Sequence, residues 1–195
     1  FKDLNDDGRI NYGDRTLDNH GDWEIIGNQA ARYNFGLNLN ANWNGIGLSM
    51  FWQGVGKKDW YPGAESALFW GQYGRSYESA QQHHTGNNVY SDENPDVTAY
   101  WPLYRGYQAV NGTGPMTLAQ NAAYLRLKNI TIDYLFPESV TSKLHLKSLK
   151  VYLSGENLLT FTPIRKVTKN FDPENINSGD SDWNSDYGSN TAGDG

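Results

Sequence analysis

The sequence predicts an all-β protein of antiparallel strands, and three observations carry this prediction. Residues 33–55 alternate apolar and polar side chains on either side of Asn44-Gly45. Two further alternating stretches occur at 123–136 and 149–161, and the connections between stretches are either very short or very long. We therefore expect strands at about 32–43, 46–55, 123–136 and 149–161, with loops at 1–31, 56–122 and 162–195.

The first two strands are predicted to form a hairpin whose register two independent features determine. From 33 to 43 the odd positions are apolar and the even positions are Asn or Gly, a period of 2 typical of a strand with two unlike faces. Asn44-Gly45 is favoured in a type I′ turn because both residues tolerate positive φ. Folding the chain across this turn opposes apolar residues in four pairs: Trp43 with Ile46, Ala41 with Leu48, Leu39 with Met50, and Leu37 with Trp52.

The later strands alternate in the same way. In 123–136, Ile130, Ile132 and Tyr134 alternate with polar residues, and Pro137 ends the pattern. In 149–161 one face carries Lys150 and Glu156, and charges are costly against lipid. That face is expected to point toward solvent or a lumen.

Loop lengths decide between two architectures that alternation alone leaves open. A soluble sandwich would bury the apolar face against a second sheet. Strands of about 10 residues also cross a bilayer when tilted. The short connections, Asn44-Gly45 and 137–148, fall at one end of the sheet and the long loops at the other. Short periplasmic turns and long external loops are typical of a transmembrane β-barrel, which the pattern favours. Since the smallest such barrels need about 8 strands, most strands would lie outside this chain.

Composition excludes several classes of protein. The 195 residues contain no cysteine, so a small disulfide scaffold is excluded. No apolar run approaches the roughly 20 residues that a membrane-spanning helix needs. The net charge of −6 gives no reason to expect a nucleic-acid partner. The chain begins in mid-pattern at Phe1 without a signal peptide, and we expect it to be part of a longer protein.

The first 14 residues contain a candidate calcium loop. They fit the template D-x-[DN]-x-[DN]-G-x5-[DE], in which alternate oxygens converge on a hard cation and glycine allows a sharp turn. An ordinary Asp/Asn/Gly turn that binds nothing is the alternative. Without flanking helical patterns, we expect a structural ion rather than a paired sensor. The predicted ligands are Asp3, Asn5, Asp7, the backbone carbonyl of Arg9, Asn11 (directly or through water) and Asp14.

The loop 56–122 is too aromatic to be simply disordered. Aromatic faces suit sugars or apolar peptide side chains, so Trp60, Trp70 and Trp101 are the predicted substrate or partner contacts. Packing of these rings against one another within the loop is the alternative. No nucleophile, base or acid pair has the spacing of a catalytic site, so the sequence does not predict an enzyme.

Several stretches together resemble one family. They are DLNDDGRINYGDRT (3–16), IGN (26–28), RYNFGLNLNANWNG (32–45), LSMFWQGVG (48–56), AYLRLKNITIDYLFP (123–137) and LKVYLSGENLLTFT (149–162). In this order and spacing they are similar to the C-terminal part of the SusC/RagA family of TonB-dependent outer-membrane transporters, typical of Bacteroidetes. The match covers Asp3 to about Thr162. Gln29-Ala30-Ala31 replaces the family's Pro-rich lead-in to the hairpin.

The resemblance implies a barrel of 22 strands, occluded by a plug and energised by TonB. It also implies a SusD-type surface lipoprotein that helps capture glycans or peptides for import. The chain lacks the family's plug, TonB-contacting segment and final strand, so it would supply wall and external loops, with the loop at 3–14 on the cell surface. The alternative is a secreted, calcium-stabilised β-sandwich that binds glycans through the aromatics of 56–122. An exposed apolar face over four strands would distinguish the two.

Overall fold

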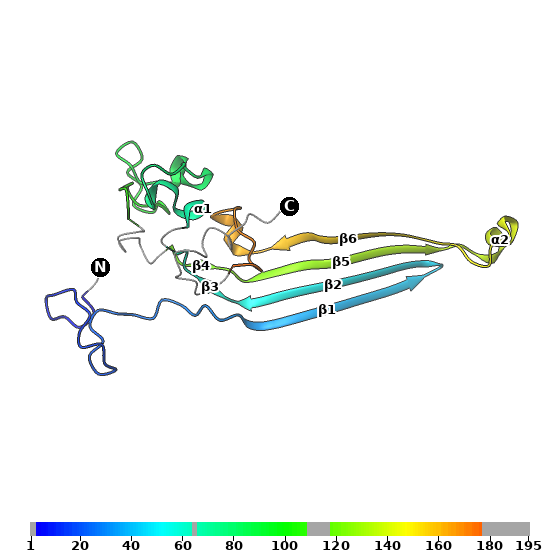
Figure 1. Ribbon diagram of the computed structural model, residues 1–195, viewed down its shortest axis with the longest axis horizontal. Helices are drawn as coiled ribbons and strands as arrows, with labels where there is room; N and C mark the ends of the chain where they lie inside the picture. The colour runs from blue at the N-terminus through cyan, green and yellow to red at the C-terminus, as the bar shows by residue number, and fades with distance from the viewer. Residues whose placement is uncertain (1–2, 64–65, 109–117, 177–195) are drawn as a thin grey trace.

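The computed structural model describes residues 3–63, 66–108 and 118–176. The main feature is one long antiparallel sheet, with the loops gathered mainly at one end (Figure 1). The sheet has the order β1-β2-β5-β6, and each strand has 12 residues. The prediction of an all-β, antiparallel architecture is confirmed, whereas barrel closure stays a prediction. The four strands are β1 (Arg32–Trp43), β2 (Ile46–Lys57), β5 (Tyr124–Leu135) and β6 (Lys150–Phe161).

The β1–β2 hairpin has the predicted register. Trp43 pairs with Ile46 and Leu39 with Met50, and the other two expected pairs are present as well. Asn44 and Gly45 have φ of 48° and 82°, the positive values that a type I′ turn requires. A Cβ on Gly45 would lie 2.7 Å from the carbonyl oxygen of Leu135, so glycine is needed both for its φ and for this close approach.

Because the strands pair in register, the apolar face of the hairpin continues across all four strands. A bulge in β5 at Lys128 shifts the alternation by one residue, so that Leu127 rather than Lys128 continues the face after Ile130. We call the resulting surface the apolar face and the other side the polar face. Five rows form the apolar face, from the turn end to the loop end: Trp43, Ile46, Tyr134 and Val151; Ala41, Leu48, Ile132 and Leu153; Leu39, Met50, Ile130 and Gly155; Leu37, Trp52, Leu127 and Leu159; Phe35, Gly54, Leu125 and Phe161.

Among the residues that the structure describes, no second layer covers the apolar face. Leu39 is 41% exposed and Leu153 is 75% exposed, although both belong to the continuous apolar surface. The only other sheet in the described part of the chain is the two-stranded pair β3 (Asp59–Trp60) and β4 (Gln120–Asn121), within the stretch expected to be loop. A sandwich needs a facing sheet, so the described residues give that interpretation no support.

The polar face carries amides, hydroxyls and charges. Asn38, Asn40 and Ser49 alternate with the apolar residues of the hairpin, and Thr131 and Ser154 continue the polar surface on β5 and β6. Near the turn end, Lys150 Nζ lies 2.7 Å from Asp133 Oδ2. The charged side of β6 therefore lies opposite the apolar face, as expected for a strand with one lipid-facing side.

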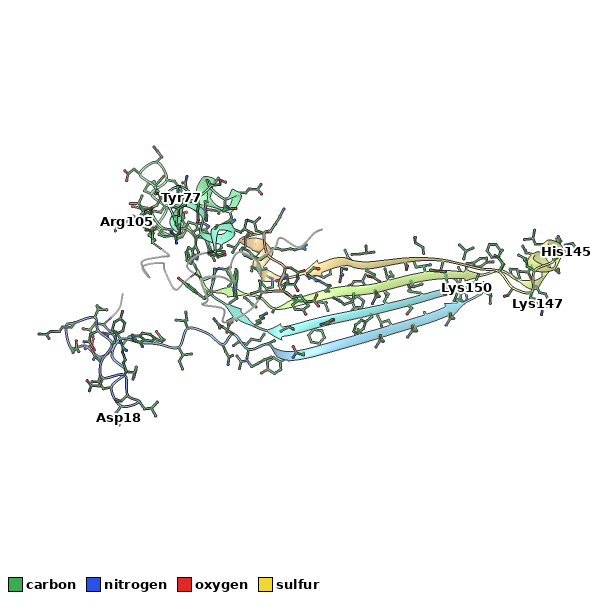
Figure 2. All side chains as sticks on the ribbon, viewed as in Figure 1. Asp18, Tyr77, Arg105, His145, Lys147 and Lys150 are labelled. Carbon is green, nitrogen blue, oxygen red and sulfur yellow. The ribbon has the colours of Figure 1, made fainter. Side chains whose placement is uncertain are left out.

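Connections are segregated by length. The Asn44-Gly45 turn and the connection containing α2 (Glu138–Thr141) and η5 (Ser142–Leu144) lie at one end of the sheet (Figure 1). The long segments lie at the opposite end, and Figure 2 shows Tyr77 and Arg105 there, far from His145 and Lys147. No described helix has both the length and the apolar character needed to cross a membrane. The remaining short helices are α1 (Ala67–Trp70), η1 (Gly71–Tyr73), η2 (Gln82–His84), η3 (Gly86–Asn88) and η6 (Pro163–Lys166).

The hydrophobic core lies among the loops rather than on the sheet. We call the described residues of 58–122 and 162–176 the loop cluster. Phe69 is 0% exposed at its centre, and residues from segments far apart in sequence pack around it. The core consists of Trp60, Phe69, Trp70, Tyr73, Trp101, Leu118, Ala122, Ile164, Phe171 and Ile176.

Candidate functional site

The three tryptophans predicted to contact substrate are brought together in the core of the loop cluster. Trp70 and Trp101 have ring centroids 6.2 Å apart, and Trp60 lies 5.8 Å from Phe69. Trp60 is 4% exposed and the other two are 1% exposed. These three indoles pack within the loop cluster, the arrangement that the alternative interpretation describes, and direct contact with a substrate or partner stays a prediction.

Two adjacent histidines pack against this core. His84 lies 4.2 Å from Trp101 between ring centroids, and His83 Nε2 lies 2.9 Å from the carbonyl oxygen of Phe69. Burial lowers the pKa of both imidazoles, and the neighbouring His83 helps to bring the pKa of His84 to about 4. Both rings are therefore neutral at pH 7, and their role there is packing.

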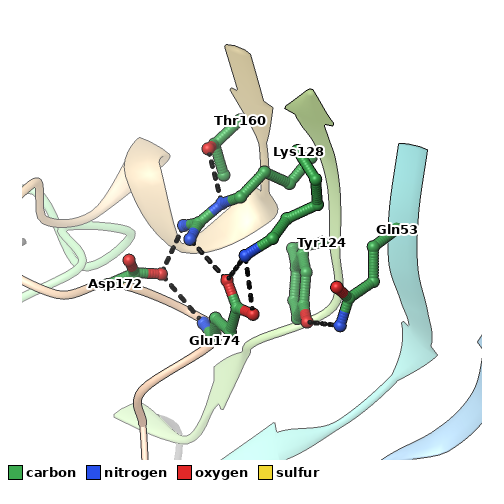
Figure 3. Close-up of polar contacts among 7 residues, drawn as sticks. Gln53, Tyr124, Lys128, Thr160, Asp172 and Glu174 are labelled. Carbon is green, nitrogen blue, oxygen red and sulfur yellow. Dashed lines mark hydrogen bonds and ion pairs between the residues drawn. The ribbon is translucent and has the colours of Figure 1, made fainter. Parts of the chain in front are cut away.

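A cluster of charges joins the sheet to the last described segment of the chain. On the polar face of β5, Arg126 forms ion pairs with Asp172 and with Glu174, the latter at 2.6 Å (Figure 3). Lys128 Nζ lies 3.1 Å from Glu174 Oε1, and Arg126 Nε donates a hydrogen bond of 3.0 Å to Thr160 Oγ1. These contacts hold residues 172–174 against the loop end of the sheet.

The same cluster is electrostatically balanced. Arg126 has a side chain only 8% exposed, and Asp172 is 15% exposed. Burial opposes ionisation of Asp172, but the Arg126 guanidinium and the backbone N–H of Glu174 outweigh it and lower the pKa of the carboxyl. The pair is therefore charged at neutral pH. Next to it, Gln53 Nε2 donates to Tyr124 Oη at 3.4 Å, so polar groups of β2 and β5 also meet on this face (Figure 3).

Sequence reasoning missed this charge cluster. Arg126-x-Lys128 and Asp172-x-Glu174 are complementary pairs of equal spacing, and that spacing was the available signal. It is weak, because 46 residues separate Arg126 from Asp172 and nothing local shows that the two segments meet.

The N-terminal loop at 3–22 is closed by a carboxylate that the calcium template does not include. Asp22 accepts hydrogen bonds from the backbone N–H of Leu4 at 2.6 Å and of Asn11 at 2.7 Å. The donors at Asn11 and Leu4 lower the pKa of Asp22. Gly13 and Gly21 pack so closely that a Cβ on Gly21 would lie 2.3 Å from Gly13 N. Asp22 and the two glycines therefore determine how this loop is closed.

The predicted calcium ligands form part of this loop. Asp3 accepts from the N–H of Gly8 at 2.8 Å, and Asp7 accepts from the N–H of Arg9 at 2.8 Å. Asn11 Nδ2 also donates to Asp7 Oδ2 at 3.2 Å.

Asp14 turns instead toward Asn19, whose Nδ2 donates to it at 2.8 Å. Within the described ranges no three His, Cys, Asp or Glu side chains are grouped as a metal site would require. The calcium site therefore stays a prediction.

Comparison with known proteins supports the sequence resemblance. The chain is 27% identical over 192 residues to TonB-dependent receptor P3 of Formosa agariphila, which covers 97% of this chain. The chain spans 17% of the length of that curated relative. No family model matches the chain. The resemblance to TonB-dependent receptors is confirmed.

Two solved structures also have some similarity to the chain. A RagAB peptide transporter is 24% identical with a TM-score of 0.47, covering 66% of this chain and 13% of that chain. The RagAB peptide importer in its open-open state has the same identity and TM-score, with coverage of 72% and 14%.

Proposed function

We propose that this chain forms part of the wall and external loops of a TonB-dependent importer in the bacterial outer membrane. One observation carries the proposal: the exposed apolar face is continuous over four strands and lies back to back with a polar face. From Phe35 to Trp43 it spans nine residues, about 27 Å along the strand. At the usual strand tilt of about 35–45°, this length corresponds to a height of about 19–22 Å along the membrane normal. Outer-membrane barrels have an outward apolar band about 25 Å tall.

Aromatic side chains mark both borders of this band. Trp43 and Tyr134 lie in its first row, and Phe35 and Phe161 in its last. Such girdles lie where hydrocarbon meets headgroups. We propose that the Asn44-Gly45 turn lies on the periplasmic side and the loop cluster on the cell surface, because short periplasmic turns and long external loops are typical of these barrels.

Site-directed spin labelling tests the proposal, since these 195 residues contain no cysteine. Single cysteines at positions 37–42 of β1 are introduced into the full-length protein, with any other cysteines replaced, and reconstituted in liposomes. We expect labels at odd positions to collide with oxygen and labels at even positions with a water-soluble nickel complex. Equal access of the nickel complex at 39 and 40 would contradict a lipid-facing wall.

The proposed partners follow from the resemblance. We propose that the loop cluster faces a SusD-type lipoprotein and a glycan or peptide substrate, while TonB acts through parts of the protein outside this chain. Trp60, Trp70 and Trp101 would act indirectly, by shaping the loops that make contact. The test is whether the full-length protein co-purifies with a surface lipoprotein. Co-purification that is retained in the Tyr77→Ala variant, but lost when Trp101→Ala unfolds the core, would support this arrangement. Retention in both variants would contradict it.

We also propose that the loop at 3–14 binds a structural calcium ion. Asp3, Asn5 and Asp7 supply the side-chain oxygens, and Arg9 supplies a backbone carbonyl. Tyr12 and Trp23, with ring centroids 5.6 Å apart, allow sensitised terbium luminescence as a readout. We expect calcium to displace terbium from the full-length protein. Combined substitution of Asp3→Asn and Asp7→Asn should abolish the signal, whereas Asp18→Asn should not; equal signals would contradict the site.

A further inference from the structure

An open cavity of about 640 Å³ lies at the loop end of the apolar face. It extends across the sheet, because Phe35 of β1 and Phe161 of β6 both line it, with Gly56 and Ala123 between them. Small residues between two aromatic rings leave the space open. On the side of the loops, Arg165 and Lys166 of η6 complete the lining.

The height of this cavity in the proposed membrane follows from the rows of the apolar face. Phe35 and Phe161 form the last row, about 27 Å along the strands from the row of Trp43. Beyond it begins the loop cluster with its polar residues. The cavity therefore spans the level at which hydrocarbon gives way to the headgroups of the outer leaflet.

The two cations are held in place by the core. Ile164 is 1% exposed, and its carbonyl accepts hydrogen bonds of 3.0 Å from the N–H groups of Val167 and Thr168. This anchored turn places Arg165 and Lys166 at the cavity with exposed side chains. In the part of the chain that the structure describes, neither forms an ion pair with a carboxylate. Guanidinium and ammonium groups beside an apolar surface match a phosphate attached to an acyl chain.

We propose that this cavity binds a phosphorylated lipid of the outer leaflet. Its phosphate contacts Arg165 and Lys166, and an acyl chain lies over Gly56 and Ala123 between the two phenyl rings. The site rests on the proposed function, because only a membrane-inserted wall presents this face to lipid. A free phosphate would use the cations but leave the apolar part of the cavity empty.

Lipid binding to the full-length protein tests the proposal. The protein is purified in detergent, stripped of lipid and titrated with diphosphorylated lipid A, with dephosphorylated lipid A and with inorganic phosphate, using native mass spectrometry. We expect tight binding of the first alone. The double variant Arg165→Gln, Lys166→Gln should lower its affinity about tenfold or more, because two cations near the phosphate are lost. Ala123→Phe should also lower it by filling the cavity, while Lys169→Gln and Lys143→Gln should not.

The outcomes separate this site from the proposed function. Suppose that the protein inserts into membranes, but the double variant and Ala123→Phe both bind lipid A as well as the unchanged protein does. The lipid site would then be overturned, while the proposed function would stand. Equal binding of the dephosphorylated lipid, or competition by inorganic phosphate at the same concentration as lipid A, would also overturn the lipid site. A full-length protein that is monodisperse without detergent would overturn the proposed function, and the lipid site with it.

Discussion

Arg126 on β5 and Asp172 beyond η6 form an ion pair on the polar face, although 46 residues separate them in sequence. The guanidinium also contacts Glu174 and Thr160, so one side chain of the sheet links the last described segment to the end of β6. The pair therefore holds residues 172–174 against the polar face of the sheet.

Removing the carboxylate should loosen this segment without unfolding the sheet. We expect Asp172→Asn to reduce local stability by about 1–3 kcal/mol, because a nearly buried guanidinium loses a charged partner but keeps Glu174. Hydrogen exchange of the full-length protein should show faster exchange at 163–176 and unchanged exchange in β1 and β2. Asp96→Asn, which removes an exposed carboxylate bonded only to Thr98 among the described contacts, is the matched control. Equal exchange in both variants would count against the anchoring role.

Acid should loosen the loop cluster through His84. Its folded-state pKa of about 4 lies below the ordinary 6.5, so folding favours the neutral ring. The stabilisation is complete above pH 6.5 and is lost as the pH falls toward 4, by up to about 3 kcal/mol. Fluorescence of the adjacent Trp101 follows the change, and His84→Gln should reduce the pH dependence. Asp172 has a lowered carboxyl pKa, so its contribution is lost only below about pH 4. If the stability of the loop cluster falls only below about pH 4, the assignment to His84 is wrong.

Trp101 should be essential to the loop cluster. It contacts Phe69, Trp70 and His84 and is 1% exposed, so Trp101→Ala should destabilise the cluster by about 3–5 kcal/mol. Limited proteolysis should then cut within 58–122, while the sheet persists. Tyr77→Ala is the control, because Tyr77 is 73% exposed on the same cluster. Similar cleavage in both variants would show that the aromatic core does not stabilise the loops.

The two faces of β1 should respond oppositely to a charge. Leu39 lies in the third of the five rows of the apolar face, near the proposed midplane of the bilayer. Leu39→Lys should therefore destabilise the folded protein in liposomes by about 2–4 kcal/mol, and Asn40→Lys should cost much less. Denaturant titration of the reconstituted full-length protein measures both. Equal costs would place the two positions in the same environment.

The local sequence pattern was sufficient to predict the register of the β1–β2 hairpin. The side-chain period of 2, the positive φ favoured at Asn44-Gly45 and the apolar pairing predicted the register from Trp43–Ile46 to Leu37–Trp52, and the structure has that register. Neighbouring residues and one tight turn determine these features, and a slip of one position would invert the face. The same locality made the resemblance recognisable, because its motifs lie mainly in the strands.

Only the tertiary structure decided what the loops do. Trp60, Trp70 and Trp101 belong to the core of the loop cluster, because Ile164, Phe171 and Ile176 from a distant segment pack around them. Asp22, and not Asp14, closes the N-terminal loop, and Arg126 meets Asp172 across β6 and η6. Burial and charge pairing of this kind depend on which remote segments meet in space, and irregular loops have no periodicity from which that could be inferred.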